Sequence, residues 1–113
     1  MNIIEFETLE SKLITYKNQL VLIDSDVADL YGVKTKEINQ AVQNNLSKFP
    51  DGYLEVVKSF DHLSKLKYSP HLPKIFTEKG LYMLATILKG EVATQTTIKI
   101  IETFANIKKL SHL

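Results

Sequence analysis

The chain has 113 residues, which suits one domain with a single core of modest size. Its composition, 44% hydrophobic and 24% charged, is that of an ordinary globular protein, and no apolar run approaches the roughly 20 residues that a membrane span needs. Cysteine is absent, which excludes disulfides and cysteine-ligated zinc, and the start of the chain is too acidic for a signal peptide. We therefore expect a cytoplasmic protein with no membrane segment.

The net charge of +1 is unevenly distributed along the chain. Residues 1–32 carry two lysines and six acidic groups (−4), residues 33–82 eight lysines and five acidic groups (+3), and residues 83–113 four lysines and two acidic groups (+2). A locally basic surface on a nearly neutral protein fits modest affinity for nucleic acid, but it also fits an ordinary solvated surface of mixed charge. Every basic residue other than histidine is a lysine, because the chain contains no arginine.

The first expected element is a β-hairpin. Two runs rich in β-branched and aromatic residues, Leu13–Tyr16 and Gln19–Ile23, flank Lys17-Asn18, and asparagine tolerates the positive φ angle of a tight turn. The segment before the hairpin, which includes Leu9, could be a short strand or a helical lead-in.

Two short helices with a tight turn between them are expected next. Ser25 is the candidate N-cap of the first helix, and Gly32 is a natural left-handed stop for it. Thr35 can cap the second helix, Thr35–Ser47, which a turn at Phe49–Gly52 ends. Such a pair is either a helix-turn-helix that reads DNA or two packed helices of a small core. The residues that share the inner face of the second helix are Ile38, Ala41, Val42, Asn45 and Leu46.

A second, shorter hairpin is expected after this pair. Its strands are Tyr53–Val57 and Lys74–Phe76. Between them, Ser59–Leu63 is predicted as a short helical turn and Lys65–Pro73 as a polar, basic loop. This loop resembles the wing of a winged helix, although a plain solvated hairpin loop would have the same composition.

Two helices complete the chain. Thr77 caps an apolar helix over 78–88, which Gly90 stops, and a last helix runs from about 92 to 110. We therefore predict an α+β fold, a small winged-helix-like domain formed by residues 1–113 as a single domain. It has an N-terminal β-hairpin, a helix-turn-helix-like pair, a short second hairpin and two C-terminal helices. The apolar stripe of the last helix, suited to packing on the core or on a partner helix, is Ile100, Phe104, Ile107 and Leu110.

The second helix of the pair carries the side chains that a DNA-reading helix needs. Asparagine and glutamine can each hydrogen-bond adenine in the major groove through both N6 and N7, and lysines can hold phosphates. The alternative is an amphipathic helix whose solvated face happens to be rich in amides. The candidate base contacts are Asn39, Gln40, Gln43 and Asn44. The candidate contacts to the DNA backbone are Lys34, Thr35, Lys36, Ser47, Lys65, Lys67, Tyr68 and Lys74.

Catalytic chemistry has little support in the sequence. There is no Gly-rich phosphate loop, no nucleophile elbow and no pair of acidic residues in a metal-binding motif. Asp24-Ser25-Asp26 could suggest a cation site, but helix capping explains it better. The three histidines lack the spacing of metal ligands. We therefore expect a protein that is not an enzyme and needs no cofactor or metal.

Two blocks of the sequence resemble a known family. LVLIDSDVADLYGVKTKEINQAVQNNLSKFPDGY, from Leu20, resembles the opening of the phage-associated ORF-six N-terminal domain, of the KilA-N and Bro-N group. LPKIFTEKGLYMLATIL, from Leu72, resembles the Leu-Pro-x-x-Phe-Thr-Glu-x-Gly-x-x-Met-Leu segment of the same family. The resemblance covers about residues 13–110. Its matching positions are Asp24, Ala28, Leu30, Tyr31, Gly32, Val33, Thr35, Lys36, Ile38, Asn39, Asn45, Phe49 and Pro50, then Leu72, Pro73, Phe76, Thr77, Glu78, Gly80, Met83 and Leu84.

The resemblance implies a DNA-binding domain, usually at the front of a longer bacterial, phage or prophage protein that regulates transcription. Some members of the wider group look like antirepressors, so the alternative is a protein-interaction module that binds a repressor or another regulator. Members often carry arginine where this chain has Asn44 and Glu102, and lysine cannot reproduce the guanidinium fork on guanine. We therefore expect either weak affinity for double-stranded DNA or a preference for A·T-rich sites, whose adenines suit asparagine and glutamine. A homodimer through the C-terminal helix would double the contacts.

Overall fold

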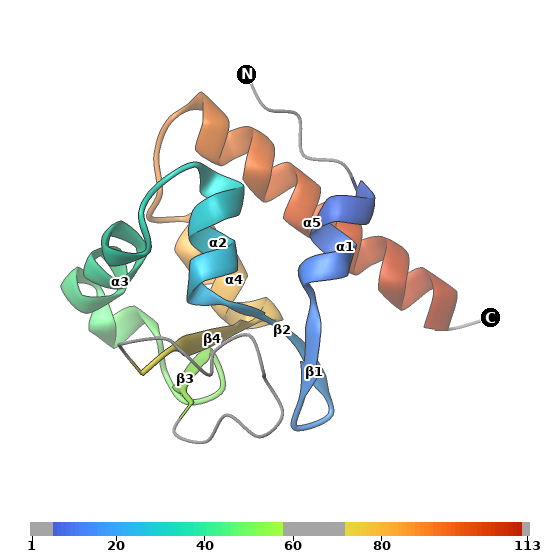
Figure 1. The fold of residues 1–113 in the computed structure, drawn as a ribbon, viewed down its shortest axis with the longest axis horizontal. Coiled ribbons are helices and arrows are strands. Elements are labelled where there is room, and N and C mark those ends of the chain that lie inside the picture. The colour runs from blue at the N-terminus through green and yellow to red at the C-terminus, as the bar shows by residue number, and fades with distance from the viewer. Residues whose placement is uncertain (1–5, 58–71, 112–113) are drawn as a thin grey trace.

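The computed structural model describes residues 6–57 and 72–111. Over these residues the chain forms helices and a four-stranded antiparallel sheet in the order β1-β2-β4-β3 (Figure 1). The elements are α1 (Phe6–Lys12), β1 (Ile14–Tyr16), β2 (Gln19–Ile23), α2 (Asp24–Tyr31), α3 (Thr35–Asn44), the 3₁₀ turn η1 (Leu46–Lys48), β3 (Leu54–Val56), β4 (Lys74–Thr77), α4 (Glu78–Ala85) and α5 (Glu91–Ser111).

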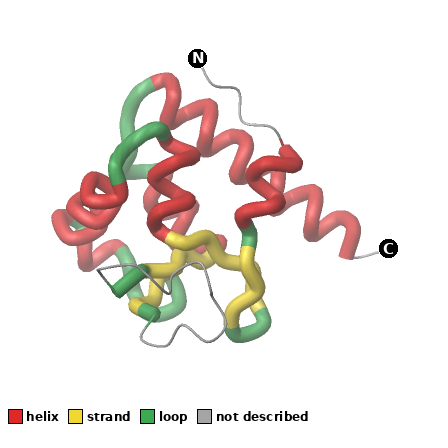
Figure 2. The backbone as a smooth tube through the Cα atoms, viewed as in Figure 1, coloured by secondary structure: helices red, strands yellow, loops and turns green. Residues whose placement is uncertain are grey.

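The expected α+β fold is confirmed. Figure 2 shows the strands gathered at one end of the molecule, with most of the helical mass on one side of them. The first hairpin, the pair of short helices, the second hairpin and the two C-terminal helices all occur in the predicted order. The predicted helical turn at residues 59–63 and most of the predicted wing lie outside the described residues.

The first hairpin forms where the sequence predicts it. Tyr16 pairs with Gln19, and between them Lys17 and Asn18 have φ angles of 51° and 65°. Two consecutive residues with positive φ make the kind of turn whose twist matches that of the flanking strands. The segment before the hairpin is helix α1, and its Leu9 is buried in the main core.

The central strands β2 and β4 have apolar side chains on both faces of the sheet. Leu22 and Phe76 point to the face that the helices cover and belong to the main core. Val21, Ile23 and Ile75 point to the opposite face and form a second, smaller cluster with Val57. This alternation follows from the two-residue repeat of a strand, and it explains why β2 reads as a continuous apolar run.

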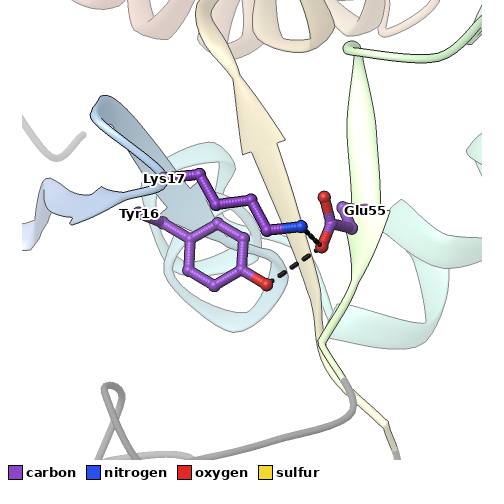
Figure 3. A network of polar contacts seen from close by, with 3 residues as sticks. All are labelled: Tyr16, Lys17 and Glu55. Atoms are coloured by element: carbon purple, nitrogen blue, oxygen red, sulfur yellow. Dashed lines mark hydrogen bonds and ion pairs between the residues drawn. The ribbon is translucent and has the colours of Figure 1, made fainter.

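A polar network links the two edges of the sheet across this second face (Figure 3). The hydroxyl of Tyr16 and the ammonium of Lys17 donate to the same carboxylate oxygen of Glu55, at 2.9 and 2.8 Å. Tyr16 is the last residue of β1 and Lys17 follows it in the turn, whereas Glu55 lies on β3, so the bonds cross above β2 and β4. The hydrogen bonds from Lys17 and Tyr16 lower the pKa of Glu55, and the bond to Glu55 raises the pKa of Tyr16.

Two predicted helix caps are wrong. Helix α2 begins at Asp24, directly after β2, so Ser25 lies inside its first turn and Ile23 is at the N-cap position without a side-chain bond. Thr35 is the first residue of α3, and the N-cap is Lys34, whose backbone N–H donates to the carboxylate of Glu37 at 3.3 Å. Glu37, three positions after the N-cap, therefore satisfies the backbone N–H of Lys34, which a cap at Thr35 would leave unbonded.

The joint between the second hairpin and α4 is unusually close. As predicted, Thr77 caps α4, and its hydroxyl accepts the N–H of Gly80 at 3.2 Å. The Thr77 backbone N–H donates to the carbonyl of Tyr53 at 3.2 Å. A β-carbon added to Gly80 would lie 1.8 Å from the Tyr53 carbonyl oxygen. Glycine is therefore needed here because backbone meets backbone. The helix ends at Ala85, before the predicted end at 88.

We expect Gly80→Ala to lower the free energy of unfolding by about 3 kcal/mol, because a rigid carbonyl rather than a flexible side chain blocks the added methyl. Urea denaturation followed by circular dichroism measures this change. Lys79→Ala, an exposed neighbour on the same helix, is the control and should change stability by less than about 0.5 kcal/mol. An unchanged urea midpoint for Gly80→Ala would contradict the close contact.

Candidate nucleic-acid interface

Helices α2 and α3 meet through a three-residue turn. Gly32 has a φ of 70°. The N–H groups of Gly32 and Val33 donate to the carbonyls of Asp29 and Ala28 at 3.2 and 3.0 Å, which satisfies two carbonyls at the end of α2. The predicted left-handed stop at Gly32 is thus confirmed. Ile38 and Val42 of α3 are buried against the main core, so the helix turns its opposite side to solvent.

The carboxylate of Asp24 connects three elements at the base of this unit. Asp24 is only 5% exposed although it is acidic. Its Oδ2 accepts the side-chain amide of Asn39 on α3 at 3.2 Å and the backbone N–H of Lys74 on β4 at 3.3 Å. Hydrogen bonds to a buried carboxylate are stronger than those between neutral groups, so Asp24 helps to set where α3 lies relative to the sheet.

Three of the four predicted base-contact residues are exposed. Gln40, Gln43 and Asn44 lie on the solvent side of α3. The side-chain amide of Gln40 donates to Oδ1 of Asn44 at 2.9 Å, one helical turn further on. This bond aligns the two neighbouring side-chain amides. The Gln40 Oε1 and the Asn44 Nδ2 take no part in it.

Asn39 is placed differently from the other amides. It is half-buried, its Nδ2 donates to Asp24, and its Oδ1 is buried without a hydrogen-bond partner in the described structure. Helical spacing alone predicts that Asn39 points outward with the others. The structure instead turns its amide toward the base of the unit, because a buried carboxylate 15 positions earlier is within reach.

The predicted backbone contacts divide into three groups. Lys34, Lys36 and Ser47 are exposed. Thr35 and Lys74 are half-buried, and the Lys74 backbone is engaged by Asp24. The remaining predicted residues, on the expected wing, lie outside the described part of the chain; they are Lys65, Lys67 and Tyr68.

The end of α3 corrects the predicted burial of Leu46 and adds one candidate residue, Lys48. Helix α3 stops at Asn44, and η1 then changes the direction in which side chains point. Leu46, expected to be buried, is 55% exposed, and Phe49 instead enters the core, where its ring meets that of Phe76 edge-on at 6.4 Å. Lys48, which sequence reasoning did not select, is also exposed beside Ser47. Its position immediately before the Phe49-Pro50 turn, which ends the helical segment, is the sequence feature that could have identified it.

The two buried acidic residues of α2, Asp24 and Asp26, have structural partners. Asp24 has those described above, and Asp26 forms an ion pair with Lys12 of α1 at 3.6 Å. No group of three or more potential metal-ligating side chains comes together within residues 6–57 and 72–111. None of the helices described is long and apolar enough to cross a membrane.

The fold and the exposed unit together define a small α+β domain that presents a helix-turn-helix-like pair. The family model of the ORF6N domain matches residues 11–87, more than half of the chain, so the chain belongs to the ORF6N domain family. It is therefore a phage-type regulatory domain. The match includes β1 to α4 and stops before α5. No curated protein and no solved structure matches the chain.

We expect Asp24→Ala to lower the free energy of unfolding by about 2 kcal/mol, because it leaves the donors of Asn39 and Lys74 without their acceptor. Urea denaturation gives the loss of stability, and hydrogen exchange should show a less protected Lys74 amide. Asp29→Ala, an exposed acidic position on the same helix, is the control. A Lys74 amide as well protected as in the parent protein would contradict this role of Asp24.

Proposed function

We propose that the chain is a sequence-reading DNA-binding domain of a phage or prophage regulatory protein, with α3 in the major groove of double-stranded DNA. The observation that carries this proposal is the outer side of α3, where Gln40, Gln43 and Asn44 are exposed together and two of them are aligned by a hydrogen bond. Three adjacent amides on a rigid helix are suited to hydrogen-bonding the edges of bases.

The packing of α3 supports this role. Ile38 and Val42 anchor the helix in the core, and Asp24 bonds Asn39 at its inner edge. We assign Asn39 to positioning the helix and leave base contact to the three exposed amides. Because packing of its inner side already fixes α3, the helix should lose little conformational entropy when its outer side binds DNA.

Lysines lie at both ends of this surface. Lys34 and Lys36 are at the start of α3 and Lys48 follows its end, and the ten residues of the helix span about 15 Å. Cations at both ends with amides between them suit phosphate contacts on either side of a groove. Glu37 is exposed among them and partly offsets the positive charge, which fits modest rather than tight binding.

The side chains available favour A·T base pairs. Amides pair with adenine, whereas the guanidinium that pairs best with guanine is missing from the chain. The exposed Leu46 adds an aliphatic group next to the amides, and the C5-methyl of thymine is the apolar feature of the major groove. We propose that Leu46 contacts thymine methyl groups while the amides contact adenine.

A salt titration tests the phosphate contacts. With a 20-base-pair duplex of alternating A·T, the binding constant of the parent protein should fall linearly with salt on logarithmic axes. Lys34→Ala/Lys36→Ala should reduce the magnitude of that slope by about two units, one for each lost phosphate contact. Fluorescence anisotropy measures the binding.

The control for this titration is Lys79→Ala/Lys99→Ala, which removes the same charge from α4 and α5 and should leave the slope almost unchanged. An unchanged slope for Lys34→Ala/Lys36→Ala would remove these lysines from the phosphate role. If the parent protein does not bind duplex DNA even at low salt, the DNA-binding proposal fails, and the protein-interaction alternative becomes the one to pursue.

A change of one methyl group in the DNA tests Leu46. Replacing thymine by uracil in the same duplex should weaken binding of the parent protein by about fourfold for each methyl group contacted. Leu46→Ala should bind both duplexes equally. Val92→Ala, which shortens an exposed aliphatic residue on α5, should behave like the parent protein. Binding of the parent protein that ignores the substitution would reject the thymine contact and leave the lysine result standing.

A further inference from the structure

Helix α5 is held firmly on the domain by one of its sides. Thr96 donates to the carbonyl of Leu30 at 3.1 Å, and the hydroxyls of Thr97 and Tyr31 lie 2.8 Å apart, within hydrogen-bonding distance. The buried residues of this side are Ala93, Thr96, Ile100, Thr103 and Phe104. They include two of the four residues of the predicted apolar stripe, while Leu110 at its end is exposed. The first half of the predicted stripe is therefore buried in the core of its own chain and is not available to a partner helix.

A different line of residues runs along the outer side of α5. Counting from Glu91, exposed residues recur at steps of three, four, three, four and three; we call them the outer seam. They are Glu91, Thr94, Ile98, Ile101, Ala105 and Lys108. This is the spacing at which two helices pack side by side, and its centre holds two large apolar residues, Ile98 and Ile101, 42% and 46% exposed.

The outer seam is complementary to itself when read in the opposite direction. If a second α5 lies antiparallel with its centre between residues 99 and 100, Ile98 faces Ile101 of the second copy. In the next layer Thr94 faces Ala105, and in the outermost layer Glu91 faces Lys108. A parallel pair would instead set Glu91 against Glu91 and Lys108 against Lys108, which like-charge repulsion disfavours.

Lys108 also has a contact within its own chain. It forms an ion pair with Glu78, to which the hydroxyl of Tyr82 donates at 2.6 Å. Partial burial alone would raise the pKa of Glu78, but the bonds from Lys108 and Tyr82 hold that pKa below its ordinary value. The Lys108 side chain is still 61% exposed, so it can reach Glu91 of a second copy without leaving Glu78 unpartnered.

We propose that the outer seam of α5 is a self-association surface, which pairs two copies of the chain as an antiparallel homodimer. The partner is a second copy of the chain, because the outer seam is complementary to itself. In an antiparallel pair the apolar layer meets an apolar layer, the small residues meet small residues, and the acidic end meets the basic end. The seam spans about 27 Å of one helix, and it covers less than the roughly 800 Å² per partner of a standard interface. The dimer is therefore weak and depends on protein concentration. The inference rests on α5 alone and does not require that the domain binds DNA.

Sedimentation equilibrium tests the pairing. The parent protein should be monomeric at low concentration and dimeric at high concentration, and Ile98→Glu should weaken dimerisation at least tenfold, because it sets a charge in the apolar centre. Val92→Glu makes the same kind of change at an exposed aliphatic position off the seam and should leave dimerisation unchanged. A parent protein that stays monomeric at all concentrations, or an Ile98→Glu protein that dimerises normally, would overturn the proposal.

Cysteine cross-linking tests whether the two helices are antiparallel. The chain has no native cysteine, so only the introduced cysteines can form disulfides. Thr94→Cys/Ala105→Cys should form a covalent dimer under mild oxidation. Each single variant should not, because two copies of the same position would lie about 16 Å apart along an antiparallel pair, beyond the reach of a disulfide. Cross-linking by the single variants would indicate a parallel pair. Failure of the double variant under conditions where the parent protein dimerises would exclude the antiparallel seam.

Discussion

The buried carboxylate of Asp24 is the constraint on which the candidate interface depends. It stands where β2 ends and α2 begins with no intervening loop, and it accepts donors from α3 and β4. A carboxylate that is almost inaccessible to water needs hydrogen-bond donors, and here both donors reach its Oδ2, so the two bonds help to hold the three elements in their relative positions. The orientation of the exposed helix is therefore tied to the sheet by a charged group as well as by apolar packing. The family resemblance includes this aspartate, and the structure gives a physical reason for it.

Under the proposed function, the outer side of α3 is the DNA-binding surface of a chain without arginine. Its polar groups are amides that both donate and accept, and its cations are lysines on flexible stems at either end. Such a surface has few of the strongest contacts available to guanine or phosphate, so a second copy of the domain would matter more for affinity than it would for an arginine-rich protein. Helix α5, which lies beyond the segment shared with the family, is the element available for that purpose.

Local sequence signals predicted the elements, whereas contacts between elements decided the details of the site. The turn at Lys17-Asn18 and the stop at Gly32 depend on positive φ angles, which are properties of single residues, and both were predictable. The inward turn of Asn39 depends on Asp24, and no helical periodicity contains that information. Leu46 was misplaced because the helical spacing was continued past the end of α3, into a turn with a different repeat. The predicted N-cap at Ser25 is wrong because α2 begins at Asp24, directly after the last residue of β2.

The network of Tyr16, Lys17 and Glu55 has a consequence for how the molecule opens. The outermost strands of a small sheet are ordinarily the first to fray, and each frays independently of the other. Here the two outer strands share one carboxylate, so neither can detach without breaking bonds that also hold the other. The sheet is thereby biased to open as one cooperative unit. Detachment of one outer strand alone, which would expose a new unpaired strand edge of the kind through which proteins most readily aggregate, is correspondingly less frequent.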